Sequence, residues 1–175
     1  DDQNTIENNR EKLFVALGWK HDDRPEIGTL PEPDLDRIAA MNPAADKAQA
    51  VENSYTMKVN KRKLENAKSD DTKETLEKTI REDTQTIGAS VTGSYQNVLA
   101  AKASMDLKGA QAQLQEKTMQ TTERQYQLGM IGKLDYLNRK YAYDSAVIQA
   151  QIAKYNLLQA IQSYEWVLNG LANAS

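Results

Sequence analysis

The fold is decided by residues 91–128, which read VTGSYQNVLAAKASMDLKGAQAQLQEKTMQTTERQYQL. Apolar residues recur here at intervals of seven, the spacing of a coiled-coil seam; this series is Val91, Val98, Met105, Ala112, Met119 and Tyr126. A second series at the same interval is displaced by two positions and consists of Ala100, Leu107, Leu114, Thr121 and Leu128. Because a helix turns by about 100° per residue, the second series lies nearly opposite the first. We therefore predict a long helix with a packed neighbour on each flank.

The C-terminal part of the chain repeats this double pattern. One series is Leu134, Tyr141, Ile148, Tyr155 and Gln162, and the other is Tyr136, Tyr143, Ala150, Leu157, Tyr164 and Leu171. A two-stranded coiled coil needs a single seam and leaves the far side of each helix charged. The paired stripes favour helices in a sheet-like or tubular wall, and the alternative is the central helix of an ordinary bundle.

Capping and breaking signals divide residues 43–175 into a helical hairpin unit with helices at about 43–68, 72–128 and 133–169. Asn42 is a good N-cap before Pro43, and Asp71 with Glu74 can form a capping box after a tight reversal at Ser69. The second break is the glycine-bearing segment 128–133. We expect an all-α fold: a long antiparallel α-helical hairpin with stacked shorter helices and coiled-coil packing, part of an α-helical barrel.

The helix lengths predict how the elements stack. At 1.5 Å per residue the helix from residue 72 spans about 84 Å and its returning partner about 55 Å, which leaves about 30 Å uncovered. The helix at 43–68 reverses at Ser69 and is long enough to cover that part. Two shorter helices placed end to end are therefore expected to flank one long helix.

Residues 1–42 are expected to hold two further parts. The segment Phe14-Val15-Ala16-Leu17-Gly18 is similar to Trp166-Val167-Leu168-Asn169-Gly170. Residues 1–18 therefore read as the end of a preceding helical repeat, and an upstream portion is expected. Residues 19–42 contain Pro25, Pro31 and Pro33 and are predicted to be a proline-bearing linker near the middle of the rod.

Composition narrows the classes of function. The 22 basic and 25 acidic residues are intermixed, with a formal net charge of −3, so no basic field exists to hold nucleic acid or an anionic membrane. Cysteine is absent, which excludes disulfides and thiolate metal sites. No apolar run approaches the roughly 20 residues that span a bilayer, so we expect no direct membrane insertion and a soluble chain.

No residue is a candidate for catalysis. His21 is the only histidine, and a solvated linker residue is the preferred interpretation over a metal ligand or general base. The basic run at 58–68 is diluted by acidic residues and reads as a solvated helix face rather than an anion site. We expect no enzyme activity, no metal and no cofactor.

Three sequence segments together resemble the TolC-like outer membrane efflux proteins. They are Arg124-Gln125-Tyr126-Gln127-Leu128-Gly129, then Leu134-Asp135-Tyr136-Leu137-Asn138, and then alternating Ala and Gln before Leu168-Asn169-Gly170. The resemblance extends from Leu17-Gly18 through the linker to the C-terminus. It implies two such repeats per protomer and a homotrimer that forms a twelve-helix periplasmic tunnel in the cell envelope.

The resemblance also implies partners and a site. A family member of this kind is an export duct that engages a periplasmic adaptor protein and an inner-membrane transporter. The tunnel tip, where the adaptor docks, is then formed by Gly129, Met130, Ile131, Gly132 and Lys133. An entrance constriction falls at Asp135 and Asn138, where Asn138 stands in place of a second acid; independently of the family, Asp135 also fits a first-turn acid favoured by the helix dipole.

The chain departs from the family at 69–71, where members that cross an outer membrane carry a pair of barrel strands. Three explanations remain open: the strands were deleted, the protein never spans a membrane, or residues are missing from the sequence. The alternative function is a structural or adaptor-type coiled-coil spacer without a channel. The exported substrate is not readable from the sequence.

Overall fold

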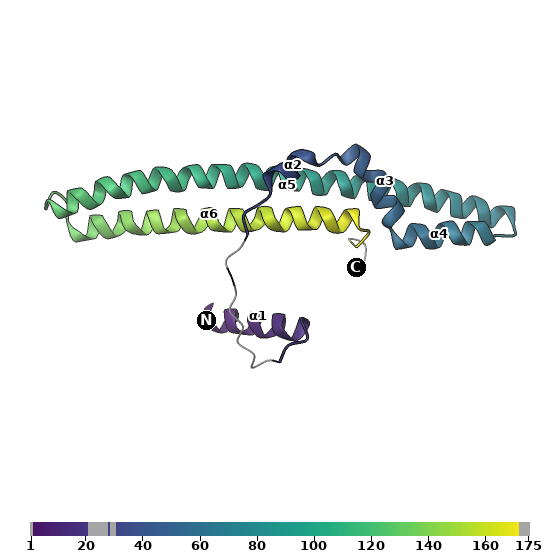
Figure 1. The fold of residues 1–175 in the computed structure, drawn as a ribbon, viewed down its shortest axis with the longest axis horizontal. Coiled ribbons are helices and arrows are strands. Elements are labelled where there is room, and N and C mark those ends of the chain that lie inside the picture. Colours follow the sequence, from purple (N-terminus) through teal and green to yellow (C-terminus); the bar gives the residue numbers. More distant parts are fainter. Residues whose placement is uncertain (1, 21–27, 29–30, 172–175) are drawn as a thin grey trace. The chain divides into compact units, whose positions relative to one another are not determined.

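The computed structural model describes residues 2–20, 28 and 31–171, and within these ranges the regular structure is all α-helical, with no β-strand. The chain divides into two units, Asp1–Pro31 and Glu32–Ser175. The helices in the described ranges are α1 (Asp2–Ala16), α2 (Leu35–Ala40), α3 (Pro43–Asn53), α4 (Tyr55–Asn66), α5 (Asp70–Gln127) and α6 (Lys133–Leu168) (Figure 1). The all-α prediction is confirmed, and membership of a barrel stays a prediction.

The second unit is built around the antiparallel pair of α5 and α6. The predicted seam is the one that packs: Val91 and Val98 of α5 and Leu157 of α6 are fully buried, in one cluster with Ile161 and Tyr164. Burying each such side chain stabilises the fold by about 1.5–3 kcal/mol. The hairpin prediction is confirmed, because one of the two predicted series on each helix supplies the residues that meet across the pair.

α4 and α6 lie in line along the same side of α5 (Figure 1). The 58 residues of α5 span about 87 Å and the 36 residues of α6 about 54 Å, so α4 covers the part of α5 that α6 does not reach. At the joint between them, Asn53 Nδ2 donates a hydrogen bond of 2.7 Å to the carbonyl oxygen of Leu168. The end-to-end stacking predicted from the helix lengths is confirmed.

The predicted single helix at 43–68 is wrong, because the chain breaks it at Ser54. Ser54 is buried and has a non-helical backbone (φ −59°, ψ 123°). Its N–H caps the end of α3 by bonding to the carbonyl oxygen of Ala50, and its hydroxyl accepts a hydrogen bond from the N–H of Met57 to start α4. One serine thus ends one helix and begins the next. The break lets the chain change direction where it meets the end of α6.

The predicted capping box at Asp71 is also wrong. α5 begins two residues earlier than predicted, and its N-cap is Ser69, whose hydroxyl accepts a hydrogen bond of 3.3 Å from the N–H of Thr72. Serine and aspartate cap helices about equally well, so local sequence does not choose between them. The reversal that was predicted here is confirmed, since α4 packs back on α5.

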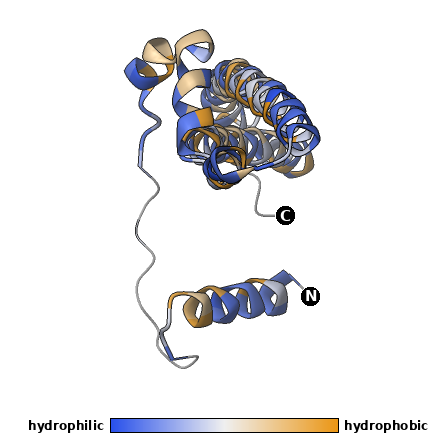
Figure 2. Ribbon diagram, turned by 90° about the vertical axis from the view of Figure 1, so that its right-hand side faces the viewer, coloured by the Kyte–Doolittle hydropathy of each residue, from blue (hydrophilic) through white to orange (hydrophobic). Residues whose placement is uncertain are grey.

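Residues 32–53 form a layer across one face of the hairpin, which we call the α2–α3 layer. Arg37 pairs with Glu165 of α6 at 2.6 Å, Glu32 pairs with Lys154, and the Tyr164 hydroxyl donates to the carboxylate of Asp46. Ile38 of α2 is buried in the core cluster. The view in Figure 2 shows this short helical segment to one side of the long helices.

The predicted linker at 19–42 is therefore partly structured. α2 lies within it, and its N-cap Asp34 accepts a hydrogen bond of 3.0 Å from the N–H of Arg37. His21, Pro25 and the rest of 21–27, together with 29 and 30, lie outside the described residues. Side-chain ion pairs with α6 hold the described part of the linker in place, and its own helical propensity would not do so.

The described part of the first unit contains α1 and the turn that closes it. Gly18 has a φ of +76°, the N–H of Trp19 bonds to the carbonyl oxygen of Phe14 at 2.8 Å, and the Trp19 ring lies 5.8 Å from the buried Phe14 ring. This is a Schellman motif, and Gly170 closes α6 with the same bonds. Gly129 closes α5 in the same way, so the assignment of 1–18 to a preceding repeat stays a prediction.

None of the helices in the described ranges combines the length and the apolar character that a membrane crossing requires.

Replacing Gly170 with alanine is expected to destabilise the hairpin. Its φ of +71° costs a non-glycine residue about 1–2 kcal/mol, and a Cβ there would lie 2.8 Å from the Asn53 carbonyl oxygen and 2.9 Å from Ser54 Cα. Gly129→Ala is the matched control. Gly129 has a similar φ of +69°, but a Cβ added there would have no atom within 4 Å. Urea unfolding should show the larger loss for Gly170→Ala, and equal losses would show that the joint is not tightly packed.

The stability of the fold is expected to decline in alkali through Tyr164. Burial first, and then the hydrogen bond and negative charge of Asp46, raise the pKa of the Tyr164 phenol far above its usual value. The folded state therefore holds this proton more tightly than the unfolded state, so the stabilisation is complete below about pH 10 and is lost as the pH rises further. Urea unfolding of Tyr164→Phe should show a flatter decline above that pH. An unchanged decline would contradict the assignment.

Candidate interaction surfaces of the hairpin

The tip of the hairpin joins α5 to α6 through residues 128–132. Gly129 takes the left-handed conformation, and the N–H of Met130 bonds back to the carbonyl oxygen of Gln125 at 2.8 Å. Gly132 is the N-cap of α6 and contributes no side-chain hydrogen bond, and its φ of −76° is open to any residue. Conformation therefore requires glycine at Gly129 but not at Gly132.

Apolar side chains surround this tip without being covered. Leu128 is 74% exposed, Met130 68% and Leu134 72%, while Ile131 is half-buried. Just inside the tip, Tyr126 of α5 stacks on Tyr136 of α6 with ring centroids 4.6 Å apart. Of the predicted docking residues, 129–132 thus lie in a compact turn next to an aromatic pair, and Lys133 is the first residue of α6.

The two predicted constriction residues lie in the first turns of α6. Asp135 and Asn138 are both exposed and three residues apart, so they project from the same side of the helix. Asp135 lies in the first turn, where the helix dipole favours an acid. Both interpretations of Asp135 thus remain compatible with its position.

The outer side of α5 carries the second predicted stripe, which is not packed within the chain. We call it the α5 flank, and it consists of Ala100, Leu107, Leu114, Thr121 and Leu128, all exposed. Leu107 is 58% and Leu114 63% exposed. The expected second neighbour of α5 is therefore not supplied by the described residues of this chain.

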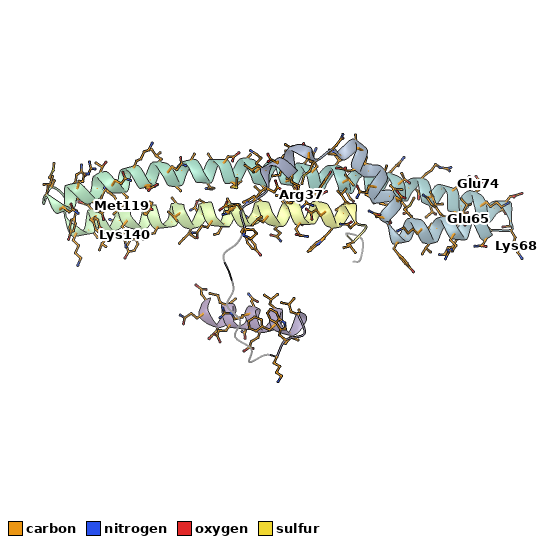
Figure 3. All side chains as sticks on the ribbon, viewed as in Figure 1. Arg37, Glu65, Lys68, Glu74, Met119 and Lys140 are labelled. Carbon is orange, nitrogen blue, oxygen red and sulfur yellow. The ribbon has the colours of Figure 1, made fainter. Side chains whose placement is uncertain are left out.

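The outer side of α6 has an equivalent stripe of different composition. This α6 flank consists of Leu134, Tyr141, Ile148, Tyr155 and Gln162, all exposed, and the sequence interpretation missed Ile152, which adjoins it and is 54% exposed. Figure 3 shows side chains projecting along the outer sides of both helices, with Met119 near the tip. Single exposed apolar residues are ordinary, but rows of them along a helix mark an interaction surface.

Charged residues gather on one broad face of the hairpin, which we call the charged face. Glu116, Glu123, Lys140 and Asp144 line one depression there. Lys154 lies two heptads after Lys140, and Glu165 lies three heptads after Asp144, so Lys154 and Glu165 continue this face toward the joint. Both residues form ion pairs with the α2–α3 layer, which therefore covers this part of the charged face. Sequence reasoning missed this layer, because the pairs join residues more than a hundred positions apart.

Among the described residues no cluster of three or more His, Asp or Glu side chains is arranged to hold a metal ion. His21 lies outside the described residues.

Comparison of the chain with protein-family models, with curated proteins and with solved structures gives no match.

Proposed function

We propose that the chain forms part of the wall of an α-helical duct for export from the cell envelope, as its resemblance to the TolC-like outer membrane efflux proteins implies. In this proposal the complete protomer carries two such units, and three protomers close a periplasmic twelve-helix tunnel. The proposal gives the chain a structural role in transport and no catalytic step. The resemblance supports it through the tip segments around Gly129 and Leu134.

The observation that carries the proposal is the pair of unpartnered flanks. A hairpin that served only as a two-helix rod would need the α5–α6 seam alone, yet apolar rows at seven-residue spacing continue on both outer sides. The α5 flank holds three leucines, whereas the α6 flank holds two tyrosines, one isoleucine and one leucine. Two unlike flanks favour a head-to-tail contact between neighbouring units, and such contacts generate rings when the rotation closes.

The tip is proposed to dock a periplasmic adaptor protein, which in turn engages an inner-membrane transporter. The exposed Met130 and the half-buried Ile131 offer the adaptor an apolar contact at the end of a rigid hairpin. Asp135 and Asn138 are then proposed to narrow the entrance just behind the tip. The runner-up is a coiled-coil spacer without a channel, which would use the same tip only as a tether.

The assembly of the complete protein tests the duct. We expect light scattering to give a trimer and negative-stain images to show a hollow ring, whereas a solid dimeric rod would support the spacer. Leu114→Lys places a charge on the α5 flank and is expected to dissociate the ring without lowering helicity. Its neighbour Gln113 is also exposed, so Gln113→Lys is the matched control and should assemble normally.

The tip proposal is tested by adding bulk where the fold tolerates it. Gly132→Phe should leave stability unchanged, because its φ is ordinary and a Cβ meets nothing within 4 Å, but it should reduce adaptor binding and export in cells that depend on the complete protein. Gly109→Phe, equally open and far along α5, is the control. Export that survives Gly132→Phe unchanged would show that the tip is misplaced.

A further inference from the structure

The face of the hairpin opposite the charged face is lined by uncharged polar side chains. We call it the amide face, and it is defined by Asn97, Ser104 and Gln111 of α5 and Gln149, Asn156 and Ser163 of α6. Within each helix these residues are seven apart, so each set lies along one line. The two lines belong to one face, because Asn97 shares a depression with Asn156 and Ser163.

Charge is nearly absent from this face along most of its length. Continuing the α5 line toward the tip gives Thr118 and Gln125, and continuing the α6 line toward the tip gives Ala142, none of which is ionisable. Away from the tip the α5 line gives Ser90 and then, beyond the end of α6 and beside α4, Asp83, which accepts a hydrogen bond of 2.9 Å from Asn60 Nδ2. Lys108 reaches this face and donates a hydrogen bond of 3.0 Å to Gln149 Oε1. Asp135 is two heptads before Gln149, so the α6 line ends at the tip with an acid, near Arg139.

The α2–α3 layer decides which broad face can line a duct. A wall built of side-by-side hairpins has two broad faces, one toward the lumen and one outward. The ion pairs of Glu32 and Arg37 place the layer on the charged face. A layer of extra helices from every unit would fill a lumen, so the layered face is the outer one. The amide face is uncovered at the same level, since Asn97 and Asn156 are exposed.

We infer that the amide face lines the lumen of the duct and that the lumen beside α6 is electrically near neutral, so that this part passes anionic and cationic solutes alike, with ionic groups there confined to Lys108 and the tip. The inference rests on the proposed duct. Amide and hydroxyl groups hydrogen-bond to water and to polar solutes of either sign, but they create no field that sorts solutes by charge. Selection by charge then falls to Asp135 at the tip.

Cysteine labelling of the assembled complete protein tests which face is inside. The chain has no cysteine, so single cysteines report one position each. Gln111 and Gln120 are both exposed and nine residues apart, which places them on nearly opposite sides of α5. Gln111→Cys should react with N-ethylmaleimide but lose reaction with a polyethylene-glycol maleimide too large for the duct, whereas Gln120→Cys should react with both.

The neutrality of the lumen has a separate readout. The reaction rates of Asn97→Cys, whose depression is lined only by uncharged residues, with a cationic and an anionic methanethiosulfonate reagent should keep, in the assembly, the ratio that they have in the unfolded chain. Adding Ser104→Glu one heptad away is the positive control and should favour the cationic reagent. A preference for either reagent without that change would overturn the neutral lumen.

The outcomes separate this inference from the duct itself. A protein that does not close into a ring overturns both. A closed ring in which the large maleimide labels Gln111→Cys as fully as Gln120→Cys leaves the duct standing and overturns the lumen assignment. Unfolded protein, in which both cysteines should react with the large reagent, shows that any protection comes from the assembly.

Discussion

The seam between α5 and α6 is the interaction on which the rest of the structure depends. Val91 and Val98 meet the α6 side chains Leu157 and Tyr164 in a single buried cluster. A long helix alone loses conformational entropy along its whole length and gains only backbone hydrogen bonds, so this apolar contact is what keeps α5 straight enough to carry other elements. α3 and α4 pack on α5, and α2 reaches the core through Ile38.

The break at Ser54 allows α4 and α6, which are both shorter than α5, to lie end to end and cover α5 together. α5 passes through this level unbroken, while α4 begins where α6 ends, and the amide of Asn53, the last residue of α3, bonds to the end of α6. Close backbone approach is possible because Gly170 has no Cβ to strike Asn53. One glycine and one serine therefore set the alignment of two helices that are remote in sequence.

The surface of this rod is differentiated around its circumference. Two apolar flanks face outward from the seam, one broad face carries charge and the α2–α3 layer, and the opposite face carries amides and hydroxyls. Each kind of surface suits a different neighbour. An apolar flank suits another helix, the charged face suits bulk solvent or a further part of the chain, and the face of amides and hydroxyls suits a water-filled path. This division of surfaces is the observation that leads us to propose a wall element rather than a free-standing coiled coil.

The sequence by itself determined the two long helices, their seam, the reversal near Ser69 and the tip at Gly129, because period-seven patterning and helix-stop signals are local properties of the chain. It also indicated both flanks, and the constriction and docking residues remain predictions from resemblance. Only the tertiary structure decided the break at Ser54 and the α2–α3 layer. Both depend on contacts such as Arg37 with Glu165, between residues far apart in sequence, which no local pattern encodes.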